Sequence, residues 1–100
     1  MSSKSFDLVQ ETPPFHPLYR QKLIRLKSFE NWPKKQFTQK AIDLCEAGFF
    51  YTNISDCVQC FHCGISIKNW KKDDRPLEQH VHYNPNCAFL KLHTGFYYIK

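Results

Sequence analysis

Residues 57–64 read CVQCFHCG, and His80 and Cys87 follow downstream. Two residues separate Cys60 from Cys63, so both thiolates can reach one ion at about 2.3 Å across a single turn. His80 follows Cys63 after 16 residues, and Cys87 follows His80 after six. Three cysteines and one histidine make a closed four-coordinate set, which is typical of structural zinc. The sequence therefore predicts one structural zinc ion, bound by Cys60, Cys63, His80 and Cys87.

The first cysteine pair has an alternative, because two residues also separate Cys57 from Cys60. We favour Cys60 and Cys63, since Gly64 follows this pair and lets the backbone turn so that its amide can face the sulfur. The residues between Cys57 and Cys60, Val58-Gln59, make a poor tight turn and suit a strand better. Because four protein ligands leave no open position for a catalytic water, the pattern disfavours metal catalysis.

Length and cysteine count restrict the class of protein. The chain has 100 residues, the size of one domain, and five cysteines, an odd number. The first residues contain no apolar segment typical of an export signal, so a secreted disulfide framework is disfavoured and a cytoplasmic location is predicted. Nowhere does the sequence approach 18 consecutive apolar residues, which indicates a protein that does not span a membrane.

The charge and the remaining cysteines argue against two further classes. Fourteen Lys and Arg against nine Asp and Glu give a net charge of +5, which more often serves solubility than nucleic-acid binding. A thiol enzyme needs an activated cysteine beside an oriented histidine. The predicted metal site leaves only Cys45 and Cys57, neither with an obvious partner, so we predict that the chain is not an enzyme. Cys45 is expected to be a small apolar residue on the inner face of a helix.

Prolines and apolar spacing divide the chain into an arm and one domain. Residues 1–17 hold three of the six prolines, so we expect a flexible N-terminal arm there and the zinc domain at residues 18–100. A first helix is predicted over residues 19–29, with basic residues opposite its apolar side, and Trp32-Pro33 ends it. The apolar side would carry Tyr19, Leu23, Ile24 and Leu26.

The rest of the domain is predicted to alternate between helices and a small sheet. Thr38 is the expected N-cap of a second helix, which has Ile42 and Cys45 on its inner face and ends at Gly48. The expected strands cover residues 49–52, 57–61 and 65–70. Pro76 suits the first turn of a third helix, and a last helix would run from Asn84-Pro85 towards His93 and stop at Gly95. The predicted fold is α+β, a three-stranded antiparallel sheet flanked by four or five short helices.

These residues resemble the baculoviral IAP repeat, the zinc module of the inhibitor-of-apoptosis proteins. The resemblance covers about residues 20–92 and includes the whole spacing C-x2-C-x16-H-x6-C. The residues that carry it are RLKSF-x-x-WP at 25–33, AGFFYT at 47–52, CxxCG at 60–64, Trp70, PxExH at 76–80 and CxF at 87–89. It implies the fold of that repeat and its structural zinc.

The resemblance also implies a function, that of a non-enzymatic inhibitor of apoptosis. Members of the family bind peptides that begin with a free amine and a small residue such as Ala or Ser, at the N-termini of pro-apoptotic antagonists or processed caspases. Such a peptide could add to the edge of the strand at residues 65–69. Asp74 would meet the peptide ammonium, and Trp70 and Tyr83 would wall the side-chain pockets. The family's anchoring positions fall on Ile67, Lys68, Asn69, Trp70, Asp74, Gln79 and Tyr83.

Three positions depart from the pattern of peptide-binding members. Asn69 stands where Asp is frequent, Ser66 where Gly is frequent, and Tyr83 where Trp is frequent. The departures leave a second hypothesis, a repeat with a closed groove that docks an adaptor protein through another face. A third hypothesis, a basic zinc module that binds nucleic acid, is less favoured because the net charge is modest.

Overall fold

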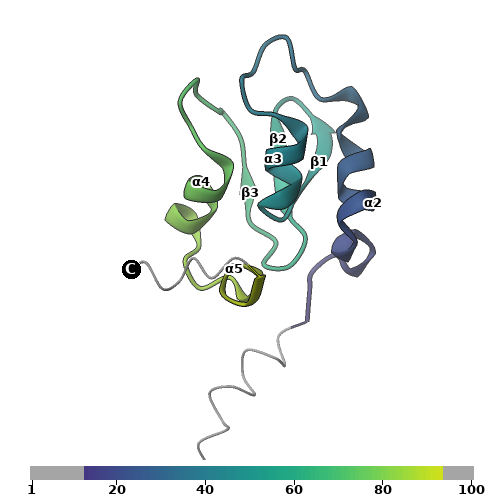
Figure 1. Cartoon of the computed structure of the whole chain (residues 1–100), viewed down its shortest axis with the longest axis vertical. Helices are drawn as coiled ribbons and strands as arrows, with labels where there is room; N and C mark the ends of the chain where they lie inside the picture. Colours follow the sequence, from purple (N-terminus) through teal and green to yellow (C-terminus); the bar gives the residue numbers. More distant parts are fainter. Residues whose placement is uncertain (1–12, 94–100) are drawn as a thin grey trace, which may run out of the picture.

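The computed structural model describes residues 13–93, which form a three-stranded antiparallel sheet flanked by short helices (Figure 1). The helical elements are the 3-10 helices η1 (Pro17–Arg20) and η2 (Ser28–Asn31) and the α-helices α2 (Lys22–Lys27), α3 (Ala41–Glu46), α4 (Pro76–Tyr83) and α5 (Ala88–His93). The strands are β1 (Phe49–Ile54), β2 (Cys57–Cys60) and β3 (Ser66–Ile67). The predicted α+β class is confirmed.

The sheet has the order β1-β2-β3, so β2 is its central strand. Phe49 pairs with Cys60 across β1 and β2, and Val58 pairs with Ile67 across β2 and β3. The register of β1 and β2 shifts between Tyr51 and Ile54, beside the turn of the hairpin. Within residues 13–93 no strand pairs with the outer edge of β3, which leaves that edge free for an added strand.

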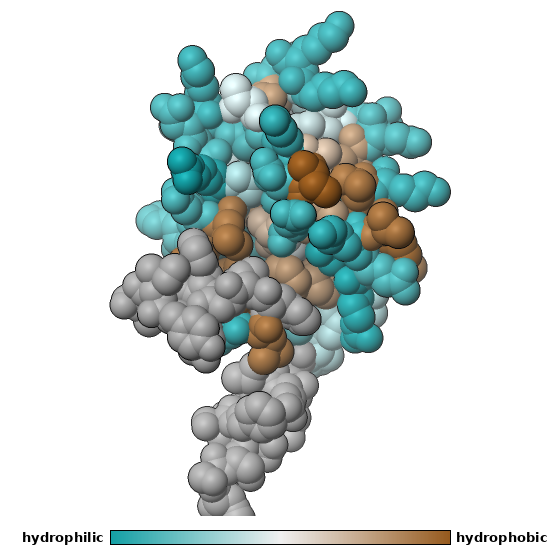
Figure 2. All heavy atoms as spheres, viewed as in Figure 1, coloured by the Kyte–Doolittle hydropathy of each residue, from teal (hydrophilic) through white to brown (hydrophobic). Residues whose placement is uncertain are grey.

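The core lies between the sheet and the helices that cover it. Figure 1 shows α3 over the sheet, with α2 on one side and α4 on the other. Leu44 of α3, Phe49 of β1 and Val58 of β2 have no exposed surface. The Trp32 ring meets Tyr51 edge-on at 5.2 Å, and its indole N–H donates to the Gln39 carbonyl at 2.9 Å. Hydrophilic side chains dominate the face shown in Figure 2, with hydrophobic ones in small groups between them.

The first predicted helix is interrupted, and its buried side differs from the prediction. Gln21 is extended between η1 and α2, and α2 ends at Lys27, where Ser28 accepts a hydrogen bond from the Tyr51 N–H at 2.8 Å. The end at Trp32-Pro33 is confirmed by the extended backbone of Trp32. The predicted apolar residue Leu23 is 72% exposed, whereas Arg25, expected on the solvent side, is buried.

Arg25 is buried because its guanidinium finds acceptors and aromatic faces inside the domain. Its Nε donates to the Cys45 carbonyl at 3.0 Å, and its Nη1 donates to the Tyr19 and Arg20 carbonyls. The guanidinium carbon lies 4.8 Å from the centre of the Phe61 ring, a cation–π contact. Burial lowers the pKa of Arg25, and the nearby Cys45 thiol opposes this shift. Helical periodicity alone assigns such a residue to the wrong face.

The second helix and the third strand are shorter than predicted. Helix α3 begins at Ala41 rather than after Thr38, because the Thr38 hydroxyl donates to the distant Lys72 carbonyl instead of capping the helix. Its predicted end is confirmed, since Gly48 has a φ of 98°. The third strand pairs only over Ser66–Ile67, because Asn69 has a φ of 63° and takes the chain out of extended geometry.

The two ends of the domain also refine the prediction. Pro76 begins α4 as expected, but Asn84 caps that helix and the last helix begins only at Ala88. Gly95 and residues 1–12 of the predicted arm lie outside the described residues. At the end of the arm, the Phe15 N–H donates to the His62 carbonyl and the His16 N–H to the Phe61 carbonyl. Across residues 13–93, no helix has the length and apolar character that a membrane crossing needs.

Leu44 and Ile42 test which face of α3 carries the core. Leu44 is fully buried, so Leu44→Ala should lower the free energy of unfolding by about 2–5 kcal/mol through lost packing and a residual cavity. Ile42, which was predicted on the inner face with Cys45, is instead 40% exposed, so Ile42→Ala should cost about 1 kcal/mol or less. Urea unfolding followed by circular dichroism measures both values. Equal losses would contradict the burial pattern of α3.

Candidate metal centre and peptide edge

The turn that follows β2 places two sulfur atoms on one side. The His62 and Cys63 N–H groups donate to the Cys60 Sγ at 3.3 and 3.4 Å. Gly64 has a φ of 80°, which favours glycine, and a Cβ there would lie 2.6 Å from the Phe15 ring. Its amide donates to the Cys60 carbonyl rather than facing the sulfur. The predicted role of Gly64 in the turn therefore holds, but His62 and Cys63 supply the amides at the sulfur.

The other two predicted ligands come from separate elements. His80 lies in α4, and its Nδ1 is 2.7 Å from the Ala47 carbonyl, which can only accept, so Nδ1 carries the proton. The opposite nitrogen, Nε2, lies 3.6 Å from the Cys63 Sγ. Cys87 stands directly before α5, and its Sγ is 3.9 Å from that of Cys60. The carbonyl of Ala47 thus orients the imidazole towards the sulfurs.

The geometry of the cluster fits a tetrahedral metal ion. The four donor atoms all lie within 4.8 Å of one another. With Zn–S near 2.3 Å and Zn–N near 2.0–2.1 Å, a tetrahedral zinc site separates two sulfurs by about 3.8 Å and sulfur from nitrogen by about 3.6 Å. The observed separations are 3.9 and 3.6 Å. The four residues that the sequence predicts as ligands therefore have both the chemistry and the spacing to hold zinc. Cys57 does not belong to this group.

The electrostatics of the cluster are those of crowded, buried thiols. Hydrogen bonds with Cys63 and Cys87 raise the pKa of Cys60, and the hydrogen bond from Cys60 lowers the pKa of Cys63. Burial opposes protonation of His80, but its hydrogen bonds to Cys63 and Cys87 outweigh burial and raise its pKa to about 9. A divalent cation at this position would compensate the charge of several thiolates at once.

Cys45 has the buried environment that the sequence predicts. Its side chain has no exposed surface, and its Sγ donates to the Lys22 carbonyl at 3.1 Å. Burial raises the pKa of the Cys45 thiol, and Arg25 opposes this shift. A raised pKa reduces the thiolate fraction on which cysteine reactivity depends.

The predicted peptide-binding residues lie along β3, the loop after it and α4. Ile67 is buried in β3, Lys68 and Asn69 are exposed beyond it, Trp70 is buried, Asp74 and Gln79 are half-buried, and Tyr83 is 56% exposed. The structure brings Asp74 and Gln79 together, because the Gln79 Nε2 lies 3.5 Å from the Asp74 Oδ1. Tyr83 stands at the end of α4 and packs edge-on against His82.

Trp70 is largely a core residue. It is 6% exposed, and its ring packs edge-on against Phe49 at 6.2 Å. Its backbone N–H donates to the buried Asp56 carboxylate at 2.8 Å. Its indole nitrogen is buried and has no hydrogen-bond partner in the described part of the chain. The core accounts for most of the ring, and a role as a pocket wall would use only its outer surface.

The family model of the Inhibitor of Apoptosis domain, BIR, matches residues 25–91. This chain belongs to the BIR family. It is similar to the apoptosis inhibitor IAP of Cydia pomonella granulosis virus, with 40% identity over 87 residues, which cover 87% of this chain and 31% of that protein. It is also 39% identical over 80 residues to the E3 ubiquitin-protein ligase IAP-3 of Orgyia pseudotsugata multicapsid polyhedrosis virus, covering 80% of this chain and 30% of the ligase. The chain thus spans less than a third of these two relatives.

Among solved structures, the BIR domain is similar to the crystal structure of DIAP1 BIR1 bound to a Grim peptide. The TM-score is 0.67 and the sequence identity is 33%, over 72% of each chain. The structural similarity agrees with the family match, because over the matched residues the two domains share the same arrangement of sheet and helices.

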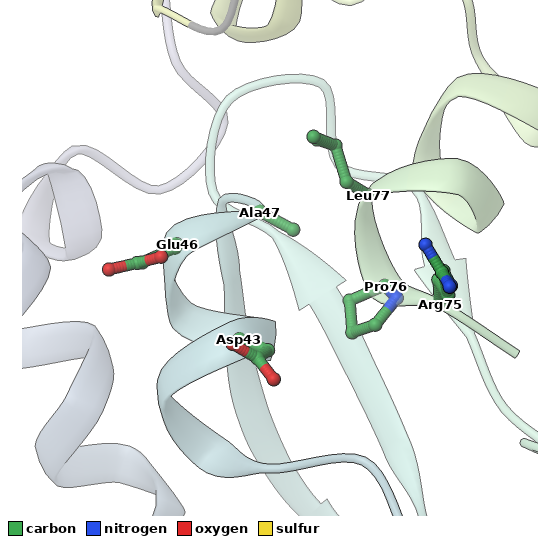
Figure 3. Close-up of a pocket in the computed structure, with 6 residues that line it drawn as sticks. All are labelled: Asp43, Glu46, Ala47, Arg75, Pro76 and Leu77. Carbon is green, nitrogen blue, oxygen red and sulfur yellow. The ribbon is translucent and has the colours of Figure 1, made fainter.

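A pocket of about 560 Å³ lies on the BIR domain between α3 and α4 (Figure 3). It is lined by Asp43, Glu46, Ala47, Arg75, Pro76 and Leu77. Figure 3 shows Pro76 and Leu77 projecting towards α3, whereas the Glu46 carboxylate points away from α4. Glu46 pairs instead with Lys22 at 3.3 Å. This pocket shares no residue with the predicted peptide site, which needs a strand edge rather than a deep cavity.

Sequence analysis missed two buried polar residues that hold the segment after β3 in this BIR domain. The Asp56 carboxylate receives the Trp70 N–H, and the Gln39 side chain donates to the Lys71 and Asp74 carbonyls. Asp56 stands in the short segment between the first two expected strands, and Gln39 stands in a polar linker without periodicity. Their partners lie 14 to 35 residues away, so no local pattern could have identified them.

Cys60 and Cys57 allow a matched test of the metal centre. Cys60→Ser should release zinc, because it removes one of four ligands that converge, whereas Cys57→Ser should retain one zinc per chain. Native mass spectrometry of the purified variants gives the zinc stoichiometry. If Cys57→Ser loses the metal and Cys60→Ser keeps it, the ligand set is wrong.

Proposed function

We propose that this BIR domain is a non-enzymatic binding module that inhibits apoptosis by capturing peptides with a free amino terminus followed by Ala or Ser. Such peptides would be the N-termini of pro-apoptotic antagonists or of processed caspases. One structural zinc ion, held by Cys60, Cys63, His80 and Cys87, would stabilise the module. The proposal rests on two neighbouring features. The outer edge of β3 has no partner strand among residues 13–93, and the loop that follows β3 carries the half-buried carboxylate of Asp74.

The edge of β3 supports the main-chain part of this recognition. Beyond β2, β3 has no partner strand among residues 13–93, so its outer N–H and C=O groups can pair with an extended peptide. Lys68 and Asn69, which follow β3, are exposed. A peptide that pairs along this edge would direct its first residue towards Trp70 and the loop that carries Asp74.

Asp74 supports recognition of the ammonium group. Its Oδ2 accepts the Lys71 N–H at 2.8 Å, and its Oδ1 lies 3.5 Å from the Gln79 amide. The carboxylate is therefore oriented by the protein while it stays half-exposed. A peptide ammonium can add a charge-assisted hydrogen bond to such an oriented carboxylate at a lower cost in conformational entropy. Since Asn69 is neutral, Asp74 is the carboxylate best placed for this role among the predicted binding residues.

The metal centre supports the site indirectly. When bound, zinc would supply charge compensation and a rigid junction, with an apparent binding free energy of about 10–16 kcal/mol. The four side chains join the end of β2 and the turn after it to α4 and to the residue before α5. His80 and Gln79 are neighbours on α4, so fixing His80 also restricts where Gln79 can stand relative to Asp74.

The solved relative supports the ligand class. In the crystal structure of that relative, DIAP1 BIR1 is bound to a Grim peptide, which is a property of that domain. We infer that the present BIR domain has the same kind of ligand because it shares the fold and the family. The ligase named among its relatives is more than three times as long as the matched segment, so that name does not argue for catalysis here.

A second candidate function is docking of an adaptor protein through another face of the domain. The pocket between α3 and α4 favours it, because the half-buried Pro76 and Leu77 line it next to charged Asp43 and Arg75. This hypothesis replaces the first one if the edge of β3 binds no peptide with a free amino terminus.

Asp74 and Asp73 provide a matched test of peptide capture. Asp74→Asn keeps an acceptor for the Lys71 N–H but removes the charge that an ammonium needs. Since Asp74 is half-buried, we expect the lower end of the cost of unpairing a charge, about 2 kcal/mol, or roughly a 30-fold weaker binding of an Ala-started peptide. Asp73→Asn, at an exposed neighbour, should leave affinity nearly unchanged. Isothermal titration calorimetry measures both.

Acetylation of the peptide amine is the complementary change. It should weaken binding to the wild type as strongly as Asp74→Asn does, and it should add little to the Asp74→Asn variant. Equal affinity of the wild type for free and acetylated peptides, or no binding of either, would contradict peptide capture and leave adaptor docking as the function.

Salt dependence separates peptide capture from nucleic-acid binding. A short peptide with one ammonium should lose less than about tenfold in affinity between 50 and 200 mM salt, because one charge pair is screened. Binding through many phosphates would fall by about 10³-fold or more over the same range. Fluorescence anisotropy with a labelled peptide and with a labelled duplex gives both slopes. Tight, steeply salt-dependent binding of the duplex would favour a nucleic-acid module.

A further inference from the structure

The segment from Trp70 to Asp74 has little regular structure but is held at both ends by buried polar side chains. Only four polar or charged residues in the described part of the chain are buried, and two of them, Asp56 and Gln39, bond to this segment. Asp56 receives the Trp70 N–H at the start of the segment. Gln39 donates to the Lys71 carbonyl and to the carbonyl of Asp74, the last residue of the segment.

Gln39 makes the more extensive of these two connections. It is 5% exposed, and its Nε2 donates to the Lys71 carbonyl at 2.7 Å and to the Asp74 carbonyl at 2.9 Å. Both partners can only accept, so the orientation of the amide is determined. The two carbonyls are the first and last of a four-residue turn, which the Asp74 N–H closes by donating to Lys71 at 3.0 Å. Gln39 therefore bridges the ends of the turn that carries Asp74.

The backbone of Gln39 is itself fixed from the core. Its carbonyl receives the buried Trp32 indole N–H at 2.9 Å. The preceding residue adds a third bond to the turn, because the Thr38 hydroxyl donates to the Lys72 carbonyl at 2.7 Å. We call these three bonds from Thr38 and Gln39 to the turn the linker clamp. Through it, the linker before α3 and the core residue Trp32 determine where the turn stands.

The position of the turn sets the position of the carboxylate. The Asp74 Oδ2 accepts the Lys71 N–H across the turn, so a change in turn geometry moves or releases the carboxylate. A charge-assisted hydrogen bond to a ligand ammonium depends steeply on distance and direction. The affinity gained from a free amine should thus depend on Gln39, although Gln39 does not contact the ligand.

We infer that Gln39 is a positioning residue that aligns Asp74 and thereby sets the preference of this domain for free over blocked amino termini. This inference rests on the proposed function for the role of Asp74, but the linker clamp can be measured without a peptide. The Gln39 Oε1 is buried without a partner among residues 13–93, so this amide is not optimised for stability. An apolar side chain of similar length at this position should make the turn at residues 71–74 less ordered. It should have a smaller effect on the free energy of unfolding of the whole domain.

The first measurement compares Gln39→Met with the wild type by amide hydrogen exchange. Loss of the two donors should speed exchange of the Lys71 and Asp74 amides by about tenfold, while amides of the β1–β2 ladder stay unchanged. Gln36→Leu is the matched control, because Gln36 lies exposed in the same linker. Zinc content and the melting temperature show whether each variant is folded. If Gln39→Met does not fold, Thr38→Val, which removes one exposed bond of the clamp, provides the same comparison.

The second measurement is the ratio of affinities for an Ala-started peptide and its N-acetylated form. A general loss of structure would weaken both peptides alike, whereas misplacement of Asp74 weakens only the free one. We expect the ratio to fall about tenfold in Gln39→Met and to stay at the wild-type value in Gln36→Leu.

Each combination of results has one meaning. Faster turn exchange together with a reduced ratio supports the inference. Unchanged exchange in Gln39→Met overturns the linker clamp, and an unchanged ratio despite faster exchange overturns the positioning role. If the wild type does not prefer the free amine, the proposed function fails and the positioning role fails with it, whereas faster exchange still establishes the clamp itself.

Discussion

Three thiols and one imidazole from separate elements converge where the sheet meets the C-terminal helices. The four donor atoms lie within 4.8 Å of one another, yet they come from the end of β2, from the turn after it, from α4 and from the residue before α5. The sheet is small, with only two paired residues in β3, and gives little stability by itself. A cation at this junction would fix α4 against the sheet, and with it the position of Gln79 beside Asp74.

Buried polar side chains extend this constraint to parts of the domain that lack regular structure. Short helices and a short ladder leave many backbone carbonyls without partners, and each buried one needs a donor. Arg25 supplies donors to the Cys45 carbonyl and to the end of η1. Its guanidinium also packs on the ring of Phe61, in the turn after β2. Gln39 likewise donates to carbonyls of the turn after β3. In a domain of this size, such side-chain donors satisfy carbonyls that longer helices and strands would pair through their own backbone hydrogen bonds.

Helix α4 connects the two surfaces on which a partner could bind. Gln79 reaches Asp74 beside the free edge of β3, whereas Pro76 and Leu77 line the pocket against α3. His80 of the same helix belongs to the metal cluster. A partner at either surface would therefore contact a helix that a cation bound at the cluster would hold in place, so a change in the cluster would affect both surfaces.

Features that depend on local chemistry could be predicted from the amino-acid sequence. The spacing of Cys60, Cys63, His80 and Cys87 predicts their grouping, and Gly48 predicts the end of α3 because a positive φ favours glycine. The resemblance to the BIR family, carried by motifs over most of the chain, added the fold. The burial of Arg25, the late start of α3 and the contacts of Gln39 became visible only in three dimensions. Each of these depends on a hydrogen-bond partner 20 or more residues away, and a local pattern of apolar and polar residues holds no information on such partners.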